Sequence, residues 1–298
     1  AAAESATVAL PAPGEPAGGA RTRGLVVELR NQLQAQAPEL ASLVAVTSTP
    51  PAVIQALLQP NEALLEYYYT DRELTVFVMT SGALKAVKLD RAGLEDSVRA
   101  FRASLASPVS ANYLNQSQRL YDRLFKPVAE SLRADKLVVV PHGVLHYLPF
   151  NALRSDKSFL IDDFSIRVEP SAGVLNLLRN RGNKAVTSAL LLGNPDLRNP
   201  DLDLKFAQEE AAAIAKLMPD AKVLLRGDAT SSFVKSEGDR YTVIHFATHG
   251  VFDLKEPLNS ALLLAPEQGS DGRLTVSDLY TLKLDATLVT LSACETAL

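Results

Sequence analysis

Tyr241-Thr-Val-Ile-His-Phe246 and Ala286-Thr-Leu-Val-Thr-Leu291 are two short apolar runs, each bounded by small and polar residues. Runs of this kind are typical of buried strands in a parallel sheet. The first leads into Ala247-Thr-His249-Gly250 and the second into Ser292-Ala-Cys294. Because chemistry gathers beyond the carboxyl ends of such strands, the pattern predicts a thiol and an imidazole at one edge of the sheet. Cys294 and His249 are therefore a candidate nucleophile and base.

Cys294 is the only cysteine of the chain, and a free cysteine is more often a core residue than a catalyst. Its position favours catalysis, because it follows a strand and lies near the polar residues Ser292 and Glu295. Backbone N–H groups at a strand-to-helix turn would lower the pKa of such a thiol and offer an oxyanion hole. For His249 the structural alternative is a ring satisfied by local hydrogen bonds. The adjacent Gly250 favours a site, since it lets the backbone turn and a substrate approach.

Two pairs of histidines have the four-residue spacing that can bind zinc on a helix, namely His142 with His146 and His245 with His249. Neither pair is expected on a helix, because prolines and a glycine interrupt the first region and the second pair spans a strand. We therefore expect no metal and no other cofactor, and a metal-dependent hydrolase is the least favoured function. His245 is instead predicted to be a buried residue that supports and orients the site.

The composition sets limits on the function. Of 298 residues, 47% are hydrophobic and 21% are charged, which predicts a well-buried core. The net charge of -4 gives no basic footprint, so we do not expect nucleic acid as a partner. No stretch reaches the roughly 18 apolar residues of a membrane helix, so no membrane partner is expected. The single cysteine fits a reducing compartment, and we expect a cytoplasmic protein.

Residues 1–24 contain eight Ala, four Gly and three Pro without apolar periodicity, which predicts a linker. The chain starts without Met, shows no signal peptide, and stops four residues after Cys294. We interpret it as a fragment of a longer protein that is cut at both ends.

A second boundary is predicted near Ala134-Asp135. Before it, residues 25–135 form an α+β subdomain, and after it residues 136–298 form an α/β domain. The domain opens with the β-branched run Leu137-Val-Val-Val140, which is typical of a strand covered on both faces.

Further elements are predicted from apolar periodicity and turn residues. Helices are expected over 25–37, 52–58, 92–106, 113–133 (restarting at Pro127), 172–180, 205–218 and 229–237. Strands are expected over 61–69, 74–79, 84–89, 165–168, 189–192 and 223–225, and a loop over 259–264.

Several segments together resemble the CHAT domain, a caspase-like family often found behind tetratricopeptide repeats in bacteria. His245-Phe-Ala-Thr-His249-Gly250 and Leu291-Ser-Ala-Cys294-Glu-Thr296 are similar to the family's His and Cys motifs. Upstream, Pro141-His-Gly-Val-Leu-His-Tyr-Leu-Pro-Phe150 and Leu190-Leu-Leu-Gly-Asn-Pro195 resemble its other signatures. The resemblance runs from about Leu64 to Leu298.

The resemblance implies a caspase-haemoglobinase-type α/β sandwich, with a mostly parallel sheet and helices on both faces, preceded by the smaller α+β subdomain. It implies a cysteine endopeptidase in which Cys294 is the nucleophile and His249 the catalytic base. The N–H groups of Gly250 and Cys294 would form the oxyanion hole. The substrate would be a protein partner, and a sensor or repeat module of the same bacterial protein would trigger cleavage.

The alternative is a protease-like module that transmits a signal or scaffolds a complex without cutting. Retention of both His249 and Cys294 favours the enzyme, since a scaffold needs neither. No third member of a catalytic triad is assigned, although Asp253 lies near His249 in sequence. The family's fold continues past the cysteine with further strands, so we expect this fragment to be inactive or weakly active.

Overall fold

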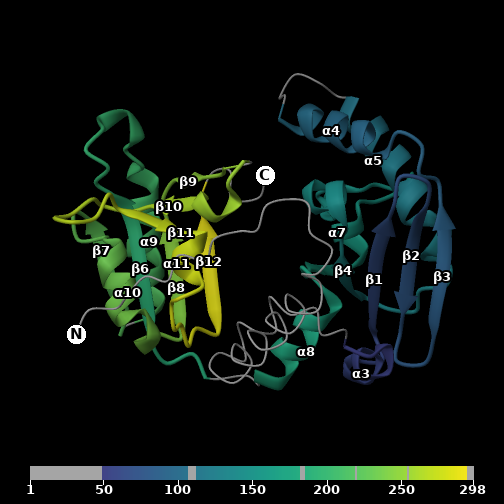
Figure 1. Ribbon diagram of the computed structural model, residues 1–298, viewed down its shortest axis with the longest axis horizontal. Helices are drawn as coiled ribbons and strands as arrows, with labels where there is room; N and C mark the ends of the chain where they lie inside the picture. The colour runs from purple at the N-terminus through teal and green to yellow at the C-terminus, as the bar shows by residue number, and fades with distance from the viewer. Residues whose placement is uncertain (1–48, 107–111, 182–184, 219, 254, 294–298) are drawn as a thin grey trace, which may run out of the picture. The chain divides into compact units, whose positions relative to one another are not determined.

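The computed structural model describes residues 49–106, 112–181, 185–218, 220–253 and 255–293. The predicted linker over 1–24 and the predicted helix over 25–37 lie outside the described residues. The described part contains two larger sheets and one small sheet (Figure 1). Each is described by itself below.

The first sheet has five strands in the order β3-β2-β1-β4-β5. Its first three strands form an antiparallel meander, and β1, β4 and β5 run parallel to one another. The strands are β1 (Glu62–Tyr69), β2 (Leu74–Met79), β3 (Leu84–Leu89), β4 (Lys136–Val140) and β5 (Ser165–Val168). All were predicted within two residues, because their apolar runs end at turn residues.

Helices cover both faces of this sheet. Side chains alternate between the faces along each strand, so Leu65 and Tyr67 lie in one apolar cluster while Leu64 lies in another. The first cluster is covered by α4 (Leu94–Leu105), α5 (Asn112–Leu124), α6 (Lys126–Ala129) and α7 (Leu160–Asp163), and by the 3₁₀ turns η1 (Gly143–Tyr147) and η2 (Phe150–Ala152). The second is covered by α3 (Pro51–Leu57) and α8 (Ala172–Arg181).

The strand β4 pairs across the boundary that the sequence predicts near Ala134-Asp135. The run Leu137–Val140 is buried and parallel, as its composition indicated. One of its two hydrogen-bonded neighbours is β1, with Leu64 opposite Val138, and the other is β5. A sheet with strands from both sides of Ala134-Asp135 therefore spans the predicted boundary. A β-branched run predicts burial on two faces, but it does not say which strand lies beside it.

The second large sheet has four strands, all parallel, in the order β12-β8-β6-β7. They are β6 (Ala189–Pro195), β7 (Lys222–Arg226), β8 (Val243–Ala247) and β12 (Leu288–Ser292). On one face α9 (Lys205–Leu217) packs on Leu191 and Val243 through Ala211. On the other face α10 (Ser231–Glu237) places Val234 against a separate apolar cluster (Figure 1). This arrangement is the parallel sheet with helices on both faces that the alternating pattern predicts.

A small antiparallel sheet follows β8 and has the order β11-β10-β9. Its strands are β9 (Gly250–Val251), β10 (Ala261–Leu263) and β11 (Arg273–Thr275), followed by α11 (Val276–Leu279). The loop predicted over 259–264 is wrong, because β10 lies within it. The three residues of β10 are too few to show the two-residue period of a strand, so the sequence carries no strand signal there. The short 3₁₀ turns are η3 (Pro200–Leu202), η4 (Gly238–Arg240) and η5 (Pro257–Asn259).

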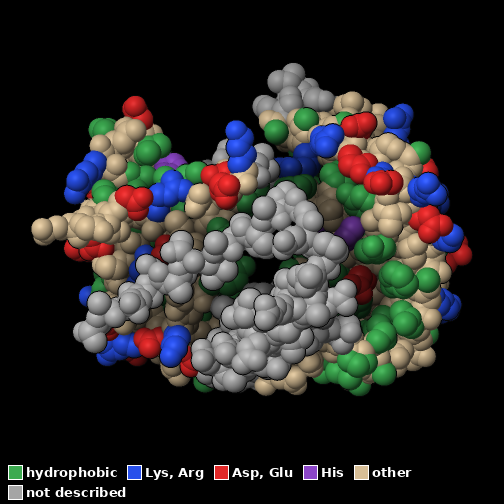
Figure 2. Space-filling view, viewed as in Figure 1, with side chains coloured by type: hydrophobic (Ala, Val, Ile, Leu, Met, Phe, Trp, Pro, Cys, Tyr) green, Lys and Arg blue, Asp and Glu red, His purple; other side chains and the backbone are tan. Residues whose placement is uncertain are grey.

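The surface of the described residues is mixed in charge. Figure 2 shows Lys and Arg side chains interspersed with Asp and Glu over the visible face. In the described ranges no helix has both the length and the apolar character that a membrane crossing needs.

Gly193 on β6 offers a test of how closely α9 approaches the sheet. A Cβ atom at this position would lie 2.8 Å from the carbonyl oxygen of Ala207 and 2.8 Å from the Cβ of Ala211. Gly193→Ala should therefore lower the free energy of unfolding by about 1–3 kcal/mol, measured by urea titration. The control is Gly82→Ala, where a Cβ meets nothing within 4 Å. Equal stability of the two variants would contradict the close packing of α9.

Candidate functional site

The two strands that precede His249 and Cys294 are neighbours. In the register of β8 and β12, Val243 lies opposite Leu288 and Ala247 opposite Ser292. Ala247 and Ser292 each stand two residues before a member of the predicted pair. The prediction that both strands are parallel and end at one edge of a sheet is therefore confirmed.

The pairing continues beyond the last residue of β8. The Thr248 N–H donates a hydrogen bond of 3.2 Å to the carbonyl oxygen of Ser292. Residue 248 directly precedes His249, so the segments that follow β8 and end β12 are still joined by a hydrogen bond next to the candidate base. Cys294 itself lies outside the described residues, so the distance between its sulfur and the His249 ring stays a prediction.

The ring of His249 has a backbone partner that sequence reasoning missed. Its Nε2 lies 3.0 Å from the carbonyl oxygen of Leu202, the last residue of η3. A carbonyl oxygen can only accept, so Nε2 carries the hydrogen and Nδ1 remains for other partners. No sequence signal could have found this contact, because every residue has a carbonyl group.

The backbone around His249 is fixed by β10. The Leu263 N–H donates to the His249 carbonyl oxygen at 2.9 Å, and the Thr248 hydroxyl donates to the Leu263 carbonyl. Thr248 is buried. These two bonds hold residues 248 and 249 against the small sheet. On the other side, Thr248 is bound to the end of β12.

Gly250 has a backbone N–H that is directed away from β10. In an antiparallel ladder, hydrogen-bonded pairs alternate with pairs that do not exchange hydrogen bonds. His249 and Leu263 form a hydrogen-bonded pair, and Gly250 lies opposite Leu262 as the next pair along. The N–H of Gly250 therefore points to the opposite side of β9.

A polar network shapes the loop that carries Leu202. Asn194 at the end of β6 is buried and has φ +48°, a left-handed conformation that Asn tolerates well. Its side-chain oxygen accepts from the Leu204 N–H at 2.8 Å, and its amide donates to Asp203 at 3.2 Å. Hydrogen bonds from Asn194 and from Arg226 lower the pKa of Asp203. The segment directly after Leu202 is thus anchored to the ends of β6 and β7.

Asp253 has a local role. Its carboxylate accepts hydrogen bonds of 2.9 Å from the N–H groups of Lys255 and Glu256. It therefore stabilises the turn after β9. The partner of the His249 ring is the Leu202 carbonyl.

His245 is buried, as predicted, with 4% of its surface exposed. Its Nε2 lies 3.3 Å from Oε1 of Glu210 on α9. The two atoms are within ion-pair distance but do not have hydrogen-bond geometry. Burial lowers the pKa of His245 below its ordinary value of 6.5, and the nearby Glu210 carboxylate opposes this shift without cancelling it. In the described parts of the chain, no group of three or more His, Cys, Asp or Glu side chains could hold a metal ion.

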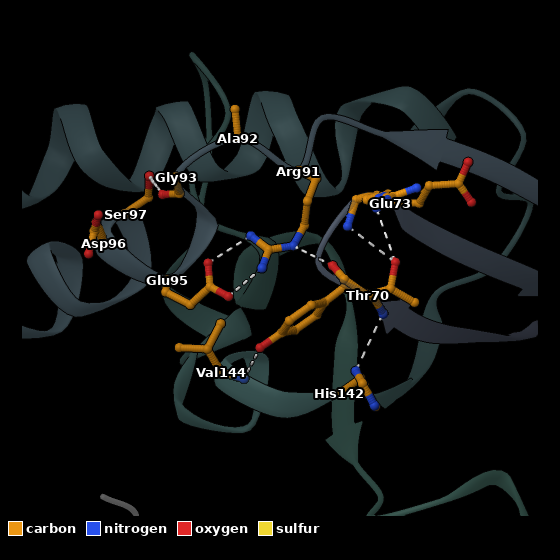
Figure 3. A network of polar contacts seen from close by, with 12 residues as sticks. Thr70, Glu73, Arg91, Ala92, Gly93, Glu95, Asp96, Ser97, His142 and Val144 are labelled. Atoms are coloured by element: carbon orange, nitrogen blue, oxygen red, sulfur yellow. Dashed lines mark hydrogen bonds and ion pairs between the residues drawn. The ribbon is translucent and has the colours of Figure 1, made fainter.

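The upstream motif Pro141–Phe150 forms the turn after β4, and its polar groups are used in packing (Figure 3). The His142 ring accepts from the Tyr69 N–H at 3.3 Å, and the Tyr69 hydroxyl accepts from the Val144 N–H at 2.9 Å. The guanidinium of Arg91 lies over the Tyr69 ring, 4.6 Å from its centroid. The described polar groups of this motif therefore serve to pack the turn against β1.

Comparison with protein-family models matches residues 114–298 to the CHAT domain. The comparison with curated proteins found no match.

The lowered pKa of His245 predicts a pH dependence of stability. The unfolded chain binds a proton at this residue at higher pH than the folded chain does. The protein is therefore most stable with respect to this residue above about pH 6.5, begins to lose that stability below this pH, and has lost it once the pH has fallen through the lowered pKa of the folded state. His245→Gln should lose less stability than wild type between about pH 7.5 and pH 5.5, as measured by thermal unfolding. Equal losses in both proteins would contradict this assignment.

Proposed function

The chain belongs to the CHAT domain family, and from this premise we propose that it is a cysteine endopeptidase that cleaves a protein partner. Membership alone implies a caspase-like, protease-related module. The observation that supports catalysis is the register of β8 and β12, in which Ala247 lies opposite Ser292, two residues before His249 and Cys294 respectively. A scaffold would not need the chain segments that carry His249 and Cys294 to leave the sheet at the same level.

In the proposed mechanism Cys294 gives its proton to Nδ1 of His249, because Nε2 is already used by Leu202. The thiolate attacks the scissile carbonyl carbon and forms a tetrahedral intermediate. As the C–N bond breaks, His249 passes the proton to the leaving amine. Water then hydrolyses the thioester, and its proton returns the thiol to its starting state.

The oxyanion of the intermediate would be stabilised by the backbone N–H groups of Gly250 and Cys294. The support for Gly250 is the direction of its N–H, which points away from β10. A preorganised donor of this kind typically contributes about 10²–10³ in rate. His245 and the loop around Leu202 would hold the base in place without touching the substrate.

The family also suggests a setting for this activity. We propose the caspase-haemoglobinase sandwich as the fold around the site and a sensor or repeat module in the same bacterial protein as the trigger. A cytoplasmic location is proposed with it. The support is the family assignment.

An experimental structure would test the geometry of the dyad. We expect the Cys294 sulfur and the nearest nitrogen of the His249 ring to lie within about 7 Å, since resting sites are looser than reacting ones. Side chains on opposite edges of the sheet would contradict the dyad. So would a separation above about 12 Å with no hinge to close it.

Kinetics of the full-length protein would test the chemistry. Cys294→Ala and His249→Ala should each lower cleavage of the natural substrate by at least about 10³-fold while leaving the melting temperature nearly unchanged. The matched control is His146→Ala, which removes an exposed imidazole of the upstream motif. If Cys294→Ala cleaves as well as wild type, the cysteine peptidase is excluded; if the wild-type protein cleaves nothing, the non-catalytic signalling module takes its place.

A further inference from the structure

One carboxylate contacts both of the strands that lead to the proposed dyad. Oε2 of Glu210 accepts a hydrogen bond of 3.1 Å from the Ser292 hydroxyl at the end of β12. Oε1 of the same group lies 3.3 Å from Nε2 of His245 on β8. Ser292 stands two residues before Cys294, and His245 stands four before His249. The side chain of Glu210 therefore contacts both strands from α9, by a hydrogen bond to Ser292 and by a close approach to His245.

The strand β12 depends on such a link. Within the ranges that the structure describes, it is the last strand of its sheet and pairs only with β8. Each of its residues from Leu288 to Ser292 is exposed, so burial contributes little to holding it. Edge strands with few buried contacts open more easily than central ones. In the described part of the chain, the end of β12 is thus held by backbone pairing with β8 and by the contact with Glu210.

The helix that carries Glu210 is a rigid support. Ala211, its neighbour, is fully buried against the sheet. The helix comes so close to β6 that a side chain at Gly193 would meet the Ala207 carbonyl oxygen at 2.8 Å. A carboxylate on this helix is held at a fixed height above β8 and β12. His245, which is 4% exposed, is an equally fixed partner on the central strand.

We infer that Glu210 is a positioning residue, which holds the end of β12 beside β8 so that Cys294 and His249 stay aligned. This inference rests on the proposed peptidase function. Glu210 acts through Ser292 and His245 and does not touch the substrate. A displacement of about 1 Å between reacting groups can cost on the order of a hundredfold in rate, so a small movement of β12 is enough to be measured.

The test is the rate of alkylation of Cys294 by iodoacetamide in the full-length protein, followed from low to high pH by mass spectrometry of the peptide that contains it. Glu210→Ala should lower the rate at neutral pH by about tenfold or more and move the pH profile towards that of an isolated thiol. Ser292→Ala should change the profile in the same direction. Glu210→Gln, which can still accept from Ser292, should recover most of the rate. Glu209→Ala is the matched control, since Glu209 is the exposed neighbour on α9.

Two further measurements separate positioning from general stability. The Thr248 amide, which donates to Ser292, should exchange its hydrogen faster in Glu210→Ala, while the melting temperature changes little. The double variant Glu210→Ala/Ser292→Ala should react no more slowly than Glu210→Ala alone, because both changes break one contact. If Glu210→Ala does not fold, Ser292→Ala at its exposed position decides the question.

The outcomes distinguish this inference from the proposed function. If His249→Ala slows alkylation but Glu210→Ala and Ser292→Ala react like wild type, the positioning role is overturned and the dyad stands. If His249→Ala reacts like wild type, the dyad fails, and the role of Glu210 fails with it.

Discussion

The parallel pairing of β12 with β8 is the constraint on which the candidate site depends. Hydrogen bonds between parallel strands are evenly spaced, so one register fixes the height of every residue that follows either strand. With Ala247 opposite Ser292, the chain segments that carry the imidazole and the thiol leave the sheet at the same level. A slip of one residue would turn each side chain of β12 to the other face of the sheet.

Each end of this arrangement is held by a different kind of contact. On the central strand, the backbone of His249 is bound by Leu263 and its ring by Leu202, so its orientation follows from main-chain groups. On the edge strand, Ser292 is bound by the Thr248 N–H and by the carboxylate of Glu210. The contacts that hold His249 come from main-chain groups, whereas Ser292 at the end of β12 is also bound by the charged side chain of Glu210 on α9.

The sequence predicts the strands of the site because apolar runs leave a local signal, although only the run on β8 is buried as expected and the residues of β12 are exposed. The apolar runs before His249 and Cys294 fall on β8 and β12, and the β-branched run Leu137–Val140 falls on β4. Periodicity carries no information on neighbours, so the pairing of β4 with β1 could not be read from it. The partners of the site were missed for the same reason. In the sequence Glu210 is one of two adjacent acidic residues on an amphipathic helix, and only the fold brings it to Ser292.

The partner of the His249 ring also explains why no acidic third residue could be identified in the sequence. A carbonyl oxygen fixes the tautomer of an imidazole as well as a carboxylate does, because either can only accept from Nε2. The identity of the side chain at position 202 does not affect this hydrogen bond. The side chains that position the Leu202 carbonyl group do affect it. Asn194 is the main example, since it binds the Leu204 N–H and Asp203 from a left-handed backbone position. Orientation of the His249 ring thus depends on the loop between β6 and α9, and the Asp253 carboxylate stabilises its own turn.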